Sequence, residues 1–353
     1  MSSKVTLLDT IMSIPRLINQ RILDIPRIEE EVKDIKKKKV VLIGSGTSYN
    51  AAFTIKNFSE KYLGLPIEPI YPNYFLNNFS SNMYSNDILY VFISQGGSTK
   101  SVLQGIDLVK SLGGDTLSLT ENLDVPIARE AKYSLDIGSI NEPFIYRTSG
   151  YSLTVLTLYV LLVKLSENIN LINSTQKHKY LSEIEILPKD IEKSISLAGD
   201  FFKEFRVELK KCKNIFFAGG NDLWPVAQEA NIKFMEMIPI VSESFELEEI
   251  IHGPQNCFTR DMGFFFLING YEDLDKAKRI SNFIKNEVKG FSLIIGNINE
   301  NEVLWLETKS VYLKALVYVS FFQTLSYELS IDNGRDLSKK IYPQLDRYIS
   351  KTI

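Results

Sequence analysis

The run Val40-Val41-Leu42-Ile43-Gly44-Ser45-Gly46-Thr47-Ser48 decides the fold class of this chain. Its first four residues are all apolar, which is typical of a strand buried on both faces of a parallel sheet. Small and hydroxyl-bearing residues follow at once, and a helical pattern begins at Tyr49. Strand, turn and helix in this order predict an open parallel α/β sheet.

The same order of elements recurs along the chain. A second buried strand is expected over residues 88–93, followed by the turn 94–99 and a helix over 100–112. Four more apolar runs predict strands at residues 116–119, 214–218, 264–268 and 291–295. Gly46 and Gly220 lie in matching turns, 174 residues apart. We therefore expect two similar α/β halves in tandem.

Composition excludes several classes of protein. The chain of 353 residues carries 40 Lys and Arg against 43 Asp and Glu, a net charge of −3, which argues against a nucleic-acid partner. Two cysteines, Cys212 and Cys257, and two histidines, His178 and His252, are too few for a disulfide framework or a His-rich metal site. No apolar run reaches the roughly 18 residues of a membrane span. We expect a cytoplasmic protein with no metal, no cofactor and no membrane partner.

Pro15, Pro26 and a polar stretch over residues 166–182 suggest the chain's organisation. A helix break is expected at Pro15, a turn near Pro26, a charged helix over 29–39, and an apolar helix over 153–165. The predicted parts are a helical leader (1–26), a first domain (27–170), a linker and helix (171–200), a second domain (201–330) and a C-terminal tail (331–353).

Two turns of the first half predict a phosphate site. Ligands bind at the carboxyl ends of the strands of such sheets, and the helices that follow offer free N–H groups to an anion. The alternative is that these are ordinary turn and capping residues. The third glycine of a dinucleotide fingerprint and the Gly-Lys-Ser/Thr of a P-loop are both missing. The candidate ligands are Ser45, Thr47 and Ser48 in one turn, and Ser94, Gln95, Ser98 and Thr99 in the other.

The matching turn of the second half, residues 219–224, lacks hydroxyl groups and carries Asp222, which would repel phosphate. We expect this half to supply chemistry instead. Lys233 and Glu236 lie three residues apart and so share a helix face, although such a pair is often an ordinary surface ion pair. His252 follows sixteen residues after Glu236, before a Gly-Pro turn, and its alternative is a structural role.

These motifs together resemble the tandem sugar isomerase (SIS) domain family, in particular the isomerase half of glutamine–fructose-6-phosphate amidotransferase. Residues 45–50 are similar to the family's Cys-Gly-Thr-Ser-Tyr-Asn turn, and residues 94–99 to its Ser-Gln-Ser-Gly-Glu-Thr turn. The pair Lys233 and Glu236 matches its Lys-x-x-Glu motif, and His252 its His-Gly-Pro motif. The family's C-terminal Asp-x-x-Arg-x-Leu-x-Lys matches Asp332, Arg335, Leu337 and Lys339.

The resemblance implies a fold of two SIS domains, each a doubly wound, five-stranded parallel sheet flanked by helices. It also implies that both turns bind a sugar 6-phosphate and that Glu236 moves a proton between C1 and C2 of the open-chain sugar. His252 would assist ring opening from the partner subunit of a homodimer. Lys339 would form a Schiff base, a step for which a desolvated lysine is suited.

The chain also departs from the family pattern. We expect no glutaminase domain, so synthase activity is not predicted. Gly96 replaces a phosphate-binding serine, and Arg147 begins a segment that differs from the family's Ser-Thr-Lys-Ala-Phe, which makes Gly46, Gly96 and Arg147 weaker substrate-lining candidates. Three glutamates, at positions 246, 248 and 249, precede His252 and suit a cationic substituent.

Three functions follow in order of preference. The first is release of an amine from an amino-sugar or fructosamine 6-phosphate, as a deaminase or deglycase. The second is plain aldose–ketose isomerisation. The third is a sugar-phosphate sensor without catalysis, which would not need the combination of Lys233, Glu236, His252 and Lys339.

Overall fold

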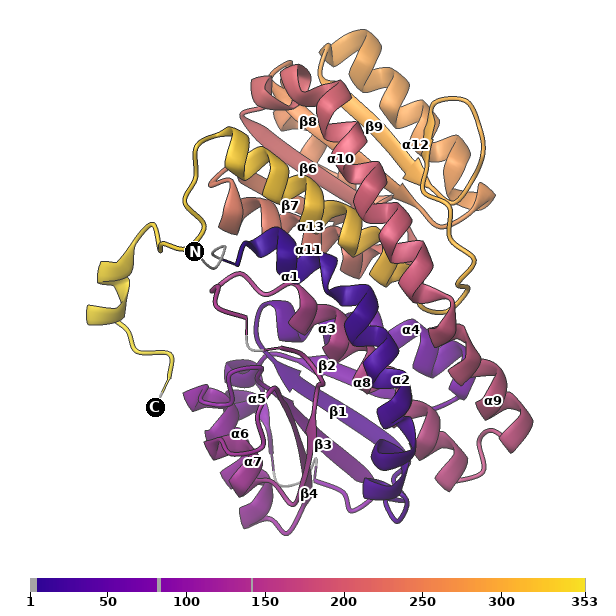
Figure 1. Cartoon of the computed structure of the whole chain (residues 1–353), viewed down its shortest axis with the longest axis vertical. Coiled ribbons are helices and arrows are strands. Elements are labelled where there is room, and N and C mark those ends of the chain that lie inside the picture. Colours follow the sequence, from indigo (N-terminus) through magenta and orange to yellow (C-terminus); the bar gives the residue numbers. More distant parts are fainter. Residues whose placement is uncertain (1–4, 81–83, 141, 353) are drawn as a thin grey trace. The chain divides into compact units, whose positions relative to one another are not determined.

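The computed structural model describes residues 5–80, 84–140 and 142–352 and forms two compact units. The first unit comprises residues 16–185 and 338–353, and the second comprises residues 1–15 and 186–337. Each unit holds one parallel sheet with helices packed on it (Figure 1). We describe the two units separately.

The first sheet has the strand order β2-β1-β3-β4-β5, and every pair is parallel. Its strands are β1 (Lys39–Gly44), β2 (Ile67–Ile70), β3 (Ile88–Ile93), β4 (Asp115–Thr120) and β5 (Tyr133–Asp136). The helical segments of this unit are α2 (Ile14–Glu31), α3 (Thr47–Thr54), α4 (Lys56–Phe58), η1 (Ser59–Leu63), α5 (Pro72–Asn78), α6 (Lys100–Ser111), α7 (Pro126–Glu130), α8 (Ser149–Asn168), α9 (Ser174–Ser182), η3 (Glu183–Glu185) and η8 (Pro343–Arg347).

The second sheet has the order β10-β9-β8-β6-β7, again all parallel, which repeats the topology of the first sheet read from the other edge. Its strands are β6 (Asn214–Gly219), β7 (Val241–Glu246), β8 (Met262–Ile268), β9 (Phe291–Gly296) and β10 (Val303–Trp305). The helical segments are α1 (Leu7–Met12), α10 (Leu187–Lys211), η4 (Asn221–Leu223), α11 (Trp224–Met237), η5 (Glu249–Ile251), η6 (Pro254–Cys257), α12 (Tyr271–Phe283), η7 (Ile284–Val288) and α13 (Lys314–Asp332). The predicted fold, two five-stranded α/β sheets in a tandem SIS arrangement, is confirmed.

Apolar side chains fill both faces of each sheet. On one face of the first sheet, Phe75 of α5 and Ile106 of α6 join Phe92 of β3 in a buried cluster. In the second unit, Phe217 stacks on Phe265 with ring centroids 5.3 Å apart. Burial on both faces explains why these strands are uniformly apolar in sequence.

The apolar helix α8 is longer than predicted, since it covers residues 149–168 instead of 153–165. By length and composition alone it could cross a membrane, which corrects the expectation that no segment is long enough. Its apolar window is 94% buried, however, as in the core helix of a globular unit. Polar residues at its two ends join the helix because buried partners satisfy them, as described below for its N-terminus.

Three local expectations were wrong. The turn near Pro26 is absent because α2 continues through this residue to Glu31, held by the fully buried Ile18 and Ile28 on its packed side. The helix predicted over 29–39 therefore ends early, and β1 already begins at Lys39. The polar stretch 166–182 is mostly helical, because Asn173 and Gln176 form a capping box that starts α9.

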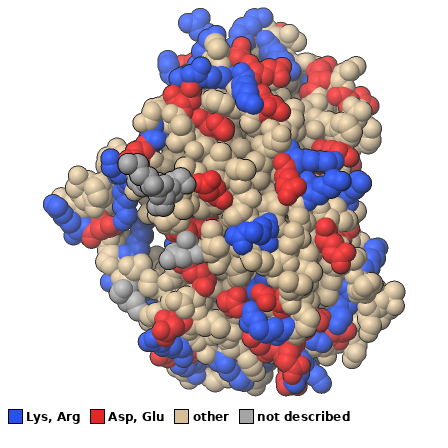
Figure 2. Space-filling view, viewed as in Figure 1, with Lys and Arg blue, Asp and Glu red and all other residues tan. Residues whose placement is uncertain are grey.

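Charged side chains of both signs are interspersed on the face of the molecule drawn in Figure 2. No stripe of one sign runs along this face. The absence of a nucleic-acid partner stays a prediction.

Candidate active site

The first predicted turn follows β1 and leads directly into α3. Gly46 adopts φ +55, a left-handed conformation that favours glycine, and it stands at the N-cap of α3 without any side-chain capping bond. A Cβ on Gly44 would lie 3.0 Å from the Cβ of Ser48, so the end of the strand packs tightly on the first turn of the helix. Ser45 is exposed, and Thr47 and Ser48 are half-buried. Gly46 itself thus contributes no side chain at the N-terminus of α3.

The second predicted turn follows β3, the strand beside β1, and so lies at the same edge of the sheet. The hydroxyls of Ser94 and Thr99 are 2.8 Å apart and close the turn across its ends. Gly97 adopts φ +68, and a Cβ there would meet Val125 at 2.2 Å, so this position requires glycine. Ser98 lies between them, half-buried. The structure thus brings the two hydroxyl-bearing turns to neighbouring strand ends, as predicted from the sequence.

The side-chain amide of Gln95 is hydrogen-bonded to carboxylates of the protein, so it does not serve simply as a donor to phosphate. Its Nε2 donates to a carboxylate oxygen of Glu121 at 3.0 Å and to one of Glu142 at 3.2 Å. Its Oε1 lies against Gly150, where a Cβ would come within 2.0 Å. Both amide hydrogens are therefore directed to carboxylates. The Gln95 side chain thus holds the second turn against the start of α8.

Glu142 is the central residue of this support, and sequence reasoning missed it. Its side chain is buried, and one carboxylate oxygen accepts four hydrogen bonds, from the N–H and hydroxyl of Thr148 and of Ser149, at 2.8–3.1 Å. A carboxylate at this place satisfies the N-terminus of α8 and its dipole. No periodic pattern marks Glu142, because it lies in an irregular segment.

Glu236 and Lys233 lie near the C-terminal end of α11, as predicted. Nζ of Lys233 is 2.9 Å from a carboxylate oxygen of Glu236. The lysine side chain is 1% exposed and that of Glu236 is 38% exposed, so the pair is not an ordinary surface ion pair. Lys233 also lies 3.4 Å from the fully buried Glu229, one helical turn earlier. Sequence reasoning missed Glu229, although its spacing of four from Lys233 is a usable signal.

His252 lies in an exposed turn between η5 and η6. Its Nε2 is 3.7 Å from a carboxylate oxygen of Glu248, which also pairs with Lys276. Gly253, the next residue, adopts φ +130 and redirects the chain. Among the described residues no hydrogen bond joins His252 to Glu236.

The predicted C-terminal motif divides into two parts. Nε of Arg335 donates to the carbonyl oxygen of Met237 at 3.4 Å, which ties this segment to the end of α11. Lys339 is exposed in the tail. Further along the tail, the carbonyl oxygen of Lys351 accepts from the N–H of Lys100, the residue that follows the second turn, at 3.1 Å. Lys351 was not among the predicted residues, since nothing in the sequence distinguishes it from other tail lysines.

The tail continues this contact with a bridge between Thr352 and Thr99. One N–H at the start of α6 is thereby already used by the tail.

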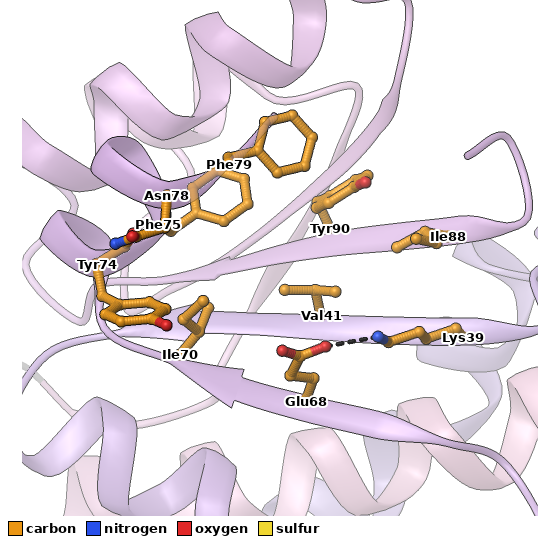
Figure 3. A pocket seen from close by; sticks show the side chains of 10 residues that line it. All are labelled: Lys39, Val41, Glu68, Ile70, Tyr74, Phe75, Asn78, Phe79, Ile88 and Tyr90. Carbon is orange, nitrogen blue, oxygen red and sulfur yellow. Dashed lines mark hydrogen bonds and ion pairs between the residues drawn. The ribbon is translucent and has the colours of Figure 1, made fainter. Parts of the chain in front are cut away.

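A cavity of about 210 Å³ lies elsewhere, on the face of the first sheet under α5 (Figure 3). Aromatic side chains of α5 and β3 form its walls, and the ion pair of Lys39 and Glu68 lies at one end. None of the predicted site residues lines this cavity. Its lining residues are Lys39, Val41, Glu68, Ile70, Tyr74, Phe75, Asn78, Phe79, Ile88 and Tyr90.

Metal ligands do not gather in the part of the chain that the structure describes: no group of three or more His, Cys, Asp or Glu side chains could hold an ion there. Cys212 is buried and Cys257 is exposed, and both are free thiols. Burial raises the pKa of Cys212 to about 11, so this thiol is not a nucleophile near neutral pH.

Comparisons with known proteins bear on the family and the fold of the chain. Residues 35–164 match the SIS domain model. A glutamine–fructose-6-phosphate aminotransferase of Sulfurisphaera tokodaii is 26% identical over 345 residues, which are 97% of this chain and 54% of that protein. The chain thus spans about half the length of this curated relative.

Two solved structures share the fold. A candidate phosphosugar isomerase from Clostridium difficile 630 superposes with a TM-score of 0.91 at 22% identity, with 99% of each chain covered. A glucosamine-6-phosphate deaminase from Thermotoga maritima gives a TM-score of 0.71 at 20% identity, covering 96% of this chain and 99% of that one. The chain therefore shares the fold of these two structures. The chain contains a SIS domain and is homologous to the isomerase half of the glutamine–fructose-6-phosphate aminotransferases.

Proposed function

We propose that this chain is a phosphosugar-isomerase-type enzyme that releases an amine from an amino-sugar or fructosamine 6-phosphate. The observation that carries the proposal is the contact of 2.9 Å between the buried Lys233 and the partly exposed Glu236. Such an arrangement fixes a carboxylate in place while leaving it open to substrate, which general base catalysis requires. The relatives act as support, since one is an aminotransferase of a sugar phosphate and one fold neighbour is a deaminase.

In this proposal the turns that begin at Ser45 and Ser94 hold the phosphate. Glu236 removes a proton from one of the two carbons C1 and C2 and returns it to the other, which converts the ketose form to the aldose form or the reverse. His252 assists ring opening. When the substrate nitrogen is bound to the carbon that becomes an imine, water adds to that carbon and the amine leaves as the carbonyl forms. No cofactor takes part in this scheme.

Proton NMR in deuterated buffer tests the proposal directly. Glucosamine 6-phosphate, fructose 6-phosphate and a fructosamine 6-phosphate are offered in turn. Deuterium at C1 or C2 together with free amine establishes a deaminase or deglycase. Deuterium without amine release establishes the plain isomerase. No exchange with any of the three, although the protein binds one of them, leaves the sensor and overturns catalysis.

The proposed role of Lys339 can be tested by comparison with a second lysine of the tail, Lys351. Lys339 is proposed to form a Schiff base with the ketose carbonyl, and Lys351 is the lysine whose backbone contacts the second turn. Borohydride reduction in the presence of fructose 6-phosphate would convert the imine to a stable secondary amine on one lysine. Peptide mapping then identifies the labelled lysine. A label on Lys351 instead of Lys339 would contradict the assignment while leaving Glu236 in its role.

We further propose a cytoplasmic homodimer in which His252 serves the site of the partner subunit. A mixture of Glu236→Gln and His252→Ala chains, each inactive alone, tests this. If the site is shared, half of the dimers are mixed and each has one intact site, so about one quarter of the wild-type activity returns. No recovery after confirmed subunit exchange would place both residues in one chain.

A further inference from the structure

Arg147 reaches the second turn at the place where Gly96 stands. A Cβ built on Gly96 would lie 4.0 Å from Nη2 of Arg147, and no other heavy atom of the described residues beyond the immediate neighbours comes as close. Gly96 is exposed, and it is not among the residues with positive φ. The guanidinium group therefore lies over an open stretch of backbone between Ser94 and Thr99.

The contacts that hold Arg147 leave much of its guanidinium group unused. Nη1 donates to the carbonyl oxygen of Glu142 at 3.3 Å and lies 3.8 Å from a carboxylate oxygen of Glu121. Both contacts are long, and the arginine side chain is 28% exposed. Among the described residues Nη2, the atom nearest Gly96, makes no hydrogen bond. A guanidinium has five N–H donors in a fixed fork, so donors remain for a ligand.

The anchor of Arg147 is rigid. The Glu142 carboxylate is fixed by its bonds to Thr148 and Ser149 at the start of α8, and its backbone carbonyl receives Arg147. The same carboxylate fixes Gln95 in the turn. One buried residue thus sets the positions of the turn and of the arginine together.

We propose that Arg147 is the cationic phosphate ligand of the second turn, an inference that rests on the proposed function. The turns otherwise offer neutral hydroxyls and N–H groups, while two carboxylates, of Glu121 and Glu142, lie beside them. A phosphate dianion would be repelled by these carboxylates unless a cation stood between. Arginine pairs with phosphate through two parallel charged hydrogen bonds, and glycine at position 96 leaves the room for it.

Calorimetric titration of inorganic phosphate and fructose 6-phosphate tests the proposal. Arg147→Ala should raise the Kd for both ligands about 30-fold, the effect of one charged hydrogen bond. Arg147→Lys should be intermediate, because a lysine keeps the charge but loses the fork. In kinetics the change should fall on KM and leave kcat within about twofold. A lowered kcat with unchanged KM would indicate a merely structural role.

A double variant separates ligand binding from charge balance. If Arg147 only neutralises Glu121, then Glu121→Gln combined with Arg147→Ala should restore phosphate affinity. If Arg147 binds the phosphate, the double variant should stay weak. Restored affinity would overturn the proposal.

Gly96→Ser in the Arg147→Ala background offers a rescue. The new hydroxyl has room at position 96 and should recover part of the lost affinity. Gly97→Ser is the matched control: its φ of +68 and its clash with Val125 predict loss of folding. Wild-type protein that binds neither ligand would overturn the phosphate site and this inference together. Wild-type binding that survives in Arg147→Ala would overturn the inference alone.

Discussion

The two sheets share one strand order but differ at the strand ends where an anion would sit. In the first sheet β1 ends at Gly44, and Gly46 turns the chain with φ +55 before hydroxyl-bearing residues. In the second sheet β6 ends at Gly219, and Asn221 turns the chain with φ +49. The residue that matches Gly46 is therefore Asn221, 175 residues later. The match predicted from the sequence, Gly220 at 174 residues, was wrong by one position. Asparagine replaces glycine here because it tolerates the left-handed conformation better than most residues.

The second sheet fills this place with a carboxylate of its own. Asp273, near the start of α12, accepts from the N–H of Asn269 at 2.8 Å and from Nδ2 of Asn221 at 3.4 Å. A Cβ on Gly220 would come within 2.4 Å of that carboxylate. Burial raises the pKa of Asp273, as expected for a negative charge held in a closed place. In our proposal the first copy of the fold keeps this place open for an anion, whereas in the second copy the carboxylate of Asp273 occupies it.

The largest expected effect comes from the second unit. Glu236→Gln removes the proposed base but keeps the shape of the side chain, so turnover should fall by about 10³-fold or more while phosphosugar binding stays near normal. Paired measurements of kcat and of ligand Kd check this. A variant that keeps most of its rate would show that Glu236 is not the base. It would also contradict the assignment of catalysis to the second unit.

The next effect belongs to the first unit. Thr99→Val removes a hydroxyl that lies 2.8 Å from that of Ser94 and keeps the size of the side chain. The KM for a phosphorylated substrate should rise about tenfold, the lower end of what a hydrogen bond to a charged group contributes. Asp222→Ala, in the matching turn of the second unit, is the control and should leave KM unchanged. Equal effects of the two variants would contradict the assignment of phosphate to the first unit.

The two left-handed turn residues predict a difference in stability. Gly46→Ala should cost about 1–2 kcal/mol of unfolding free energy, because φ is positive there while no heavy atom of the described residues beyond the neighbours lies within 4 Å of the new Cβ. Asn221→Ala should cost less, since asparagine already carries a Cβ in that conformation. Urea denaturation of both variants measures the difference. The reverse order would mean that Asn221 is held mainly by its bond to Asp273.

The smallest effect is a pH dependence confined to the second unit. Arg206 and Lys210 of α10 hold the pKa of Asp332, at the end of α13, at about 2. Because this folded-state pKa is lower than the unfolded one, the stabilisation is present at neutral pH and is lost as pH falls from about 4 to about 2. The Tm of Asp332→Asn should lie slightly below that of wild type at pH 7, and the gap should narrow below about pH 4. In the first unit, Asn168 makes the matching contacts with neutral backbone carbonyls, so Asn168→Ala should show no such narrowing.

Sequence alone predicts most of the fold. The buried strands are recognised because burial on both faces removes polar residues, as in residues 88–93, which match β3 at both ends. The short edge strands β2 and β10 lack that signature because one side of each is unpaired. The helix through Pro26 depends on tertiary packing, which local signals do not contain.

For the candidate site, spacing on one helix finds Lys233 and Glu236, and small residues after buried strands find the two turns. Glu142 and Lys351 were not predicted, because only their contacts in the folded chain bring them to the candidate site. Arg147 was singled out only as a weak candidate, since its approach to Gly96 depends on an irregular segment.

The chain passes between the two units three times, after residues 15, 185 and 337. A gene fragment that ends at residue 185 would lack the tail, whose Thr352 bridges Thr99, and would carry α1 without its partner α13. The remaining fragment, 186–353, would lack α1. Neither unit is therefore encoded by one continuous stretch of gene. Split at this point, the protein should regain its structure only when both fragments are produced together in one cell.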